Sequence, residues 1–214
     1  KYDEALGYYS RLEEIADFRD NVIEAQAGQM RCYYKKQDFD NSITYARKII
    51  DGDKVSNELL NEAHLLHGRS SLNTNDLQKA TAEFTIVAKI PNSESGAEAK
   101  YSLAFIQYKL GNFKESQKKC FDIINQIPSY EFWIGKSFLL LGDNYVALKD
   151  LFQAKHTYRS LIDNYEKNVA DPEDIRALAQ EKLNTIEKGE NESLQKEIEA
   201  KEKQSFGGEN DSTG

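Results

Sequence analysis

Apolar residues recur along most of the chain at spacings of three and four, which is the period of an amphipathic α-helix. Short polar segments interrupt this pattern at regular places. Four stretches align with one another, because each has an apolar or aromatic helix end, a polar turn, an Asp or Asn, a bulky apolar residue and then a small residue. These stretches are residues 33–50, 71–88, 107–124 and 145–162. The pattern predicts a series of helix–turn–helix hairpins.

The small residues of the four stretches set the period. They are Ser42, Ala80, Ser116 and Ala154, at spacings of 38, 36 and 38 residues. Twelve residues before each of them the chain has Met30, Gly68, Ala104 and Gly142, where the two helices of a hairpin must approach closely. A single hairpin cannot bury its apolar face alone, so this period predicts a solenoid of stacked hairpins.

Side chains that can accept hydrogen bonds from free helical N–H groups mark the expected helix starts. For the second helix of each hairpin they are Asp38, Asp76, Asn112 and Asp150. Ser95 with Glu98 has the spacing of a capping box at the start of a first helix. Asp171 followed by Pro172 predicts the start of a final helix.

The chain resembles the tetratricopeptide repeat family in several short motifs. These are Gly142-x-x-Tyr145, residues 108–116 (YKLGNFKES), Ala80-x-x-x-Phe84, Ala154-x-x-x-Tyr158 and a closing Pro128. The family period is about 34 residues, and we expect the extra residues here in the turns. The resemblance implies an all-α fold, an α–α superhelix of about four hairpins at residues 20–52, 57–91, 95–128 and 131–166, with a capping helix at residues 171–188. The first repeat departs most from the family pattern.

The residues at both ends of the chain lead to further predictions. Residues 2–9 match the second helix of a repeat, so we expect the repeat domain, residues 1–188, to begin in mid-repeat and further repeats to precede it. Residues 189–214 have seven acidic residues and three lysines. They predict a solvated charged helix that ends in about eight disordered residues. We favour a passive tail over a coiled-coil contact, which needs three or more heptads.

Composition excludes several classes of function. The net charge of −8 argues against a nucleic-acid binder, since such proteins need a basic face. No apolar run reaches the roughly 18–20 residues of a membrane span. No secretory leader is visible at the start. Cys32 and Cys120 each lie in an apolar helical pattern, which favours two buried thiols over a disulfide.

Catalytic motifs are missing from the sequence. It contains no G-x-S-x-G, G-x-x-x-x-G-K-[ST], G-x-G-x-x-G or C-x-x-C segment. His64 and His67 lie three residues apart and could both touch a metal, but neither cysteine adds the further ligands that zinc prefers. We interpret them as one packed histidine and one histidine at the hairpin seam. The sequence therefore predicts a non-catalytic protein without a metal or cofactor.

The resemblance also implies where a partner binds, because the first helix of each repeat lines the concave groove in this family. The inward positions we single out are Arg31, Tyr34, Lys35, Leu65, Arg69, Leu72, Tyr101, Phe105, Tyr108 and Lys136. Tyrosine and arginine are enriched at binding hot spots. Two alternatives stay open: Tyr34 and Tyr108 could pack between repeats, and the two arginines could bind a partner carboxylate or pair with Glu24, Glu62 or Glu98. In chaperone-binding members of the family, a set of Lys and Asn residues binds a C-terminal carboxylate. The corresponding positions here are Ala27, Leu65 and Tyr101.

The function predicted from these features is a scaffold that binds a protein or a peptide. The alternative is an accessory repeat segment of a larger enzyme or signalling protein. Residues 157–168 and 81–116 are similar in style to bacterial cell-envelope repeat proteins of the Tol-Pal coordinator and outer-membrane assembly lipoprotein types. This likeness favours a periplasmic or outer-membrane-associated location and leaves a cytoplasmic one open.

Overall fold

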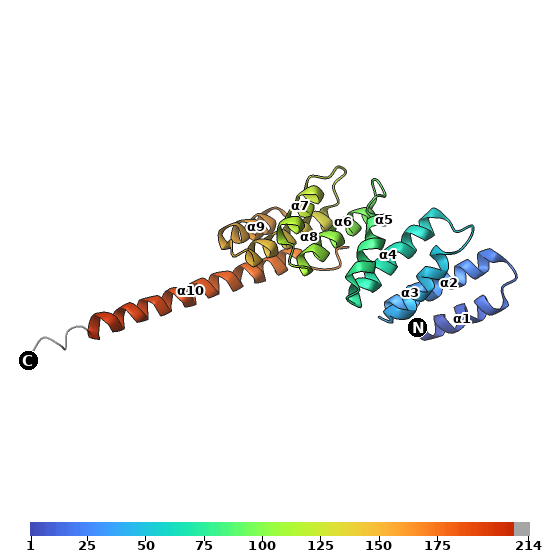
Figure 1. The fold of residues 1–214 in the computed structure, drawn as a ribbon, viewed down its shortest axis with the longest axis horizontal. Coiled ribbons are helices and arrows are strands. Elements are labelled where there is room, and N and C mark those ends of the chain that lie inside the picture. Colours follow the sequence, from blue (N-terminus) through green and yellow to red (C-terminus); the bar gives the residue numbers. More distant parts are fainter. Residues whose placement is uncertain (208–214) are drawn as a thin grey trace, which may run out of the picture. The chain divides into compact units, whose positions relative to one another are not determined.

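The computed structural model describes residues 1–207, with side chains described as far as residue 201, and every regular element in that part is an α-helix. The helices are α1 (Tyr2–Ile15), α2 (Arg19–Lys35), α3 (Phe39–Ile50), α4 (Asn57–Asn73), α5 (Leu77–Val87), α6 (Glu94–Lys109), α7 (Phe113–Ile124), α8 (Glu131–Ala147), α9 (Leu151–Asn164) and α10 (Ile175–Gly207) (Figure 1). The all-α prediction is confirmed, and helices α2 to α9 form pairs at the places where the repeats predict hairpins.

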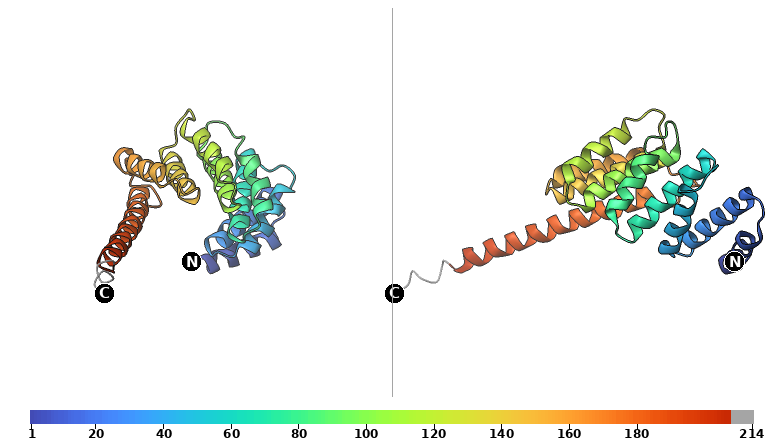
Figure 2. Two further views of the ribbon diagram at one scale, coloured as in Figure 1. Left: turned by 60° about the vertical axis from the view of Figure 1, so that its left-hand side comes forward. Right: turned by 45° about the vertical axis from the view of Figure 1, so that its right-hand side comes forward.

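The chain divides into two compact units. The N-terminal unit is residues 1–133, and the C-terminal unit begins at Ile134. In the N-terminal unit each helix packs against the next, from α1 through α7, and the blue to green helices of Figure 2 form one row of hairpins. The second helix of a pair therefore contacts both its own first helix and the first helix of the following pair.

The core of the N-terminal unit lies between successive pairs. One apolar cluster, drawn from α2, α3 and α4, consists of Ala27, Met30, Ala46, Ile49, Ala63 and Leu66. Another, drawn from α4, α5 and α6, consists of Leu65, Ala80, Phe84, Val87, Ala99 and Ile106. Because each cluster needs three consecutive helices, a hairpin is stabilised mainly by its neighbours.

The predicted seam positions are buried in every hairpin. Ser42, Ala80, Ser116 and Ala154 are fully buried, as are Met30 and Ala104. A β-carbon added at Gly68 would lie 2.9 Å from Cε1 of Phe84, and one at Gly142 would lie 2.3 Å from Cε1 of Tyr158. Only a residue without a side chain fits against those rings, which confirms the predicted register.

All four second helices begin where the sequence predicts, and three of these starts have a side-chain cap. Asp38, Asp76 and Asp150 each accept a hydrogen bond from the backbone N–H three residues on. Asn112 is the N-cap residue of α7, but its side chain accepts no hydrogen bond from the helix, and its amide donates to Gln107 Oε1 at 3.0 Å.

Two other predicted starts are wrong. The cap of α6 is Ser93, whose Oγ accepts from Gly96 N at 3.0 Å, and not Ser95. The helix α10 begins at Ile175, where Asp174 accepts from Ala177 N at 3.0 Å. Asp171 instead accepts from Asn168 N at 2.8 Å, so it stabilises the preceding turn.

Helix α10 continues through Gly189 without a break and extends beyond the N-terminal start of α9 (Figures 1 and 2). Its first part is a packed helix, with Ile175, Ala179 and Leu183 buried. From Lys188 to Lys201 every side chain is exposed, as expected of a solvated helix. The disorder predicted for the last eight residues falls almost wholly outside the described residues.

Candidate protein-binding face

Two arginine–glutamate pairs join the first helices of successive hairpins in the N-terminal unit. Arg31 of α2 donates from Nε to Glu62 Oε1 at 2.7 Å and from Nη2 to Glu62 Oε2 at 2.6 Å. Arg69 of α4 makes the same double contact with Glu98 of α6. The Glu98 side chain is 11% exposed and that of Glu62 is 35% exposed, so the second pair is better shielded from water. Double contacts of this kind fix the geometry of both side chains.

The carboxylates also set the protonation of the two arginines. Hydrogen bonds to Glu62 raise the pKa of Arg31. Burial acts to lower the pKa of Arg69, but the hydrogen bonds and charge of Glu98 outweigh it and raise the pKa. Both guanidinium groups are therefore fully charged and already paired. Of the two alternatives that the sequence left open, the one observed is pairing with glutamates of the next hairpin.

A partly exposed aromatic cluster lies on α6 and at the start of α8, and we call it the aromatic ladder: Tyr101, Phe105 and Tyr108 of α6 with Trp133 of α8. The ring of Phe105 stacks on those of Tyr101 and Tyr108, with centroids 6.4 Å away in each case. The Tyr101 ring also meets the Trp133 ring at 5.5 Å. All four side chains are neither buried nor fully exposed. The spacing of residues 101, 105 and 108 places the three rings on one side of the helix.

Cationic side chains flank the aromatic rings. The Arg69 guanidinium lies 6.0 Å from the Tyr34 ring centre, and Lys109 Nζ lies 5.8 Å from the Phe105 ring centre. Lys35 and Lys109 are exposed. Tyr34 also packs against the cluster of α2, α3 and α4, so it has the inter-repeat role that the sequence left as an alternative. This surface offers aromatic faces with Lys109 beside Phe105.

Three of the predicted groove residues have other surroundings. Leu65 is only 9% exposed within the cluster of α4, α5 and α6, and Leu72 packs against that cluster. Both are core residues, because the apolar stripe of α4 faces α5. Lys136 lies in the C-terminal unit, where its Nζ is 2.5 Å from Glu173 Oε1.

Trp133 is a member of the ladder that the repeat alignment did not single out. It is the only tryptophan of the chain. Its position at the start of α8 has no counterpart among the inward positions of the other first helices. A large aromatic residue is a recognisable signal of a contact surface, and its rarity here would have been a reason to include it.

A polar cluster in the α4–α5 hairpin combines His64, His67 and Glu83. His64 Nδ1 lies 2.6 Å from Glu83 Oε2, and His67 Nδ1 lies 3.1 Å from Glu83 Oε1. Burial alone would raise the pKa of Glu83, but the contacts with His64 and His67 outweigh it and lower the pKa to about 2. His67 is buried and His64 faces α5, which agrees with one packed histidine and one histidine at the seam.

Three other findings bear on chemistry. Cys32 and Cys120 are both buried, as predicted. Within residues 1–207, no cluster of three or more His, Cys, Asp or Glu side chains has an arrangement suited to a metal ion. None of the helices in that part of the chain combines the length and the apolar character of a membrane span.

The comparison with protein families gives one match, over residues 136–168, which cover most of α8 and α9. The matching family is the tetratricopeptide repeat. The match supports the tetratricopeptide repeat family for this chain and gives no support to a cell-envelope subtype. The α4–α5 hairpin shares with the matched hairpin a seam glycine that faces a buried aromatic ring. No curated protein matches the chain.

Proposed function

We propose that the N-terminal unit is a non-catalytic scaffold that binds a protein segment through the aromatic ladder. Tetratricopeptide repeats generally mediate protein–protein interaction and are typically not catalytic. The observation that carries the proposal is the ladder itself, in which several large rings stack in a row and remain partly exposed. Aromatic side chains provide large, rigid contact areas, and they dominate the free energy of binding at many interfaces.

The charges around the ladder suggest the chemistry of the partner segment. Arg31 and Arg69 are each held by a glutamate, so a partner carboxylate would have to displace an existing pair. Lys109 is exposed beside Phe105. An apolar or aromatic anchor with an acidic group nearby complements such a surface. In this proposal Lys109 contributes mainly to the association rate and to its dependence on salt.

A photo-crosslinking experiment in the native host tests this proposal. A photoreactive phenylalanine analogue replaces Tyr108 in one variant and Phe121 of α7 in a control. Phe121 is 45% exposed but has no place in the ladder. We expect a discrete crosslinked protein from position 108 and none from position 121. The same product from both positions, or none from position 108, would contradict the proposal.

Point substitutions provide a second measurement once a partner is known. Tyr108→Ala should weaken binding by roughly 1–2 kcal/mol, because the ring supplies contact area at a partly exposed site. Tyr108→Ala removes contacts with the rings of Phe105 and Phe113, and Phe105→Ala removes contacts with those of Tyr101 and Tyr108, so the melting temperature of each variant is measured beside its affinity. Unchanged affinity in Tyr108→Ala would remove the ladder from the interface.

For the setting of this scaffold we propose the bacterial cell envelope. The support is the stylistic likeness of residues 81–116 and 157–168 to envelope repeat proteins, together with a net charge of −8 that argues against nucleic acid. Fractionation of the host, with detection by an antibody, tests this location. We expect the protein in the periplasmic or outer-membrane fraction, and recovery with the cytosol alone would contradict it.

A further inference from the structure

The C-terminal unit has a second surface suited to binding, a hollow of about 420 Å³ between the start of α9 and the middle of α10. Leu151 lines it from α9, and Ile186 and Leu194 line it from α10. A β-carbon added at Gly189, which also lines the hollow, would meet nothing within 4 Å. Leu151 is 36% exposed and Leu194 is 56% exposed, so the hollow presents apolar surface to solvent.

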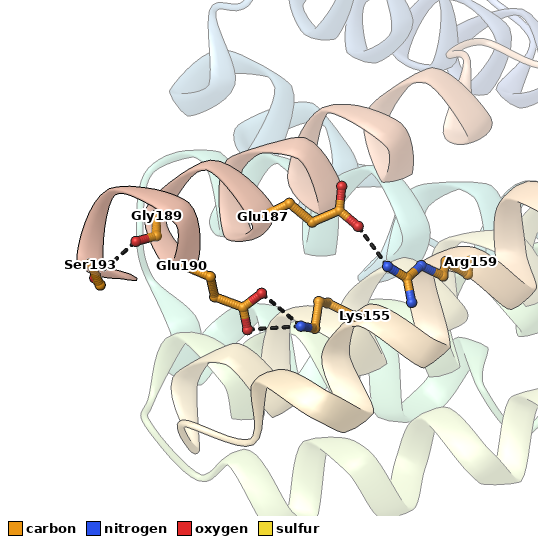
Figure 3. Close-up of polar contacts among 6 residues, drawn as sticks. All are labelled: Lys155, Arg159, Glu187, Gly189, Glu190 and Ser193. Carbon is orange, nitrogen blue, oxygen red and sulfur yellow. Dashed lines mark hydrogen bonds and ion pairs between the residues drawn. The ribbon is translucent and has the colours of Figure 1, made fainter. Parts of the chain in front are cut away.

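The α10 residues of the hollow form two parallel rows with a spacing of four. One row is Thr185, Gly189, Ser193 and Glu197, and the other is Ile186, Glu190 and Leu194. Rows with this spacing enclose a groove that accepts the side-chain ridge of another helix. The smallest residues of the first row are Gly189 and Ser193, which permit a close approach. The Ser193 hydroxyl already donates to the Gly189 carbonyl at 2.9 Å (Figure 3). A partner helix that covers Ser193 would therefore leave this hydroxyl with a hydrogen bond.

Ion pairs hold this part of α10 against α9. Lys155 Nζ donates to both carboxylate oxygens of Glu190, at 2.8 and 2.7 Å, and Arg159 Nη2 donates to Glu187 at 2.6 Å (Figure 3). The groove is therefore formed before any partner arrives. The charged side chains that line it are Glu190, already paired, and Glu197, which has no partner among residues 1–201. A carboxylate at the edge of an apolar groove attracts a cation.

We propose that this groove binds an amphipathic helix of a partner protein, with an apolar ridge against Leu151, Ile186 and Leu194 and a lysine or arginine against Glu197. A second copy of the chain is a poor occupant, because its own α10 would place Glu190 and Glu197 near the same acids. The groove lies wholly within the C-terminal unit and uses no residue of the aromatic ladder. The inference is thus independent of the proposed function of the N-terminal unit.

The test uses the full chain and synthetic helical peptides of about 18 residues, a length at which such a peptide can begin to form a helix. The first peptide has leucine along one face and lysine elsewhere, and the second has glutamate in place of lysine. A third peptide has the same composition as the first, but its leucines are distributed around the helix and form no apolar face. Fluorescence anisotropy of the labelled peptides measures affinity. We expect the first peptide to bind and the other two to bind at least about tenfold more weakly.

Matched variants locate the binding on α10. Gly189→Leu fills the open space at the groove, whereas Gly189→Ala adds only a methyl group. We expect the leucine variant to weaken binding about tenfold or more and the alanine variant to weaken it less. Glu197→Gln should weaken binding by about threefold, with a smaller loss at high salt, and Glu199→Gln should leave it unchanged. Glu199 is exposed on the same helix and does not line the groove, so this control has the same change in net charge.

Three results would overturn the inference. One is equal binding of the lysine and glutamate peptides, and another is unaltered binding by Gly189→Leu. The third is sedimentation of the wild-type chain as a dimer that Gly189→Leu converts to a monomer, because the occupant would then be a second copy. Circular dichroism of each variant verifies that α10 stays helical, as expected when leucine replaces glycine within a helix.

Discussion

The α4–α5 and α8–α9 hairpins have the same steric arrangement at their seams. In each, a glycine of the first helix faces an aromatic ring of the second, with Gly68 against Phe84 and Gly142 against Tyr158. Both rings are buried, at 0% and 1% exposure. A β-carbon added at Gly142 would lie closer to its ring than one added at Gly68, at 2.3 Å against 2.9 Å. A close approach of the two helices is thus shared by the α4–α5 and α8–α9 hairpins.

The polar contacts beside these seams differ. In the α8–α9 hairpin the aromatic residue itself is polar, and the Tyr158 hydroxyl donates to Asp143 Oδ1 at 2.6 Å. Phe84 has no hydroxyl, and its hairpin is joined instead by the neighbouring Glu83 with His64 and His67. The comparison indicates that packing geometry is shared between the repeats, whereas hydrogen bonds can move to adjacent positions.

The largest effect should come from filling the seams. Gly142→Leu and Gly68→Leu should each destabilise their unit by roughly 1–3 kcal/mol or more, because the new side chain overlaps a buried ring. The loss should be greater at Gly142, where the ring is closer. Thermal unfolding monitored by circular dichroism measures both. Gly189→Ala is the control, and it should gain about 0.5–1 kcal/mol since its site is open and helical. Equal melting temperatures for wild type and both leucine variants would show that the seams are not close-packed.

A smaller and pH-dependent effect should come from Glu83. Its pKa is about 2 in the folded chain and near 4.5 without its partners, so its carboxylate stabilises the fold above pH 4.5. This contribution is lost as the pH falls from about 4.5 to 2. Glu83→Gln should therefore cost about 1–3 kcal/mol at pH 7 and little near pH 2. Urea unfolding across this pH range measures the difference.

Glu58→Gln is the matched control for Glu83→Gln, because Glu58 is exposed on α4. Its effect should be within about 0.5 kcal/mol of zero at every pH. A Glu83→Gln variant with wild-type stability at pH 7 would mean that the two histidines contribute no net stabilisation through this carboxylate.

The smallest effect should come from Tyr158→Phe. The substitution keeps the ring that packs on Gly142 and removes one hydrogen bond, so we expect a loss of about 0.5–1.5 kcal/mol. Asp143 retains the contact with Lys182 Nζ at 2.8 Å, which limits the loss. Denaturant unfolding gives the value. A loss above about 3 kcal/mol would show that the hydroxyl, and not the ring, is the main stabilising group of this seam.

The seams and three helix caps could be predicted from the sequence because they depend on local rules. A small residue is required where helices touch, and an aspartate at a helix start satisfies free N–H groups. The start of α10 could not be predicted in the same way, since Asp171 and Asp174 are both good caps. Asp171 accepts a hydrogen bond from Asn168 N in the preceding turn, and this contact depends on how the loop folds.

The candidate site was predictable in part. The aromatic residues of α6 followed from the repeat alignment, and so did the two arginines as inward-facing positions. Which acid each arginine pairs with depends on the distance between neighbouring first helices, so the sequence left Glu24, Glu62 and Glu98 as alternatives. The continuity of α10 through Gly189 was also not predicted, because the composition becomes strongly charged from that residue on and suggested a boundary.

The arginine–glutamate pairs have a direction along the chain: each arginine reaches forward to the glutamate of the following repeat. Helix α4 has both halves of this connection, since Glu62 accepts from Arg31 and Arg69 donates to Glu98. A second copy of the α4–α5 hairpin could therefore pack after the first and form the same ion pair. A tandem duplicate of residues 57–93 would present Arg69 of the first copy to Glu62 of the second, so this repeat is a module by which the array could be lengthened without a new interface.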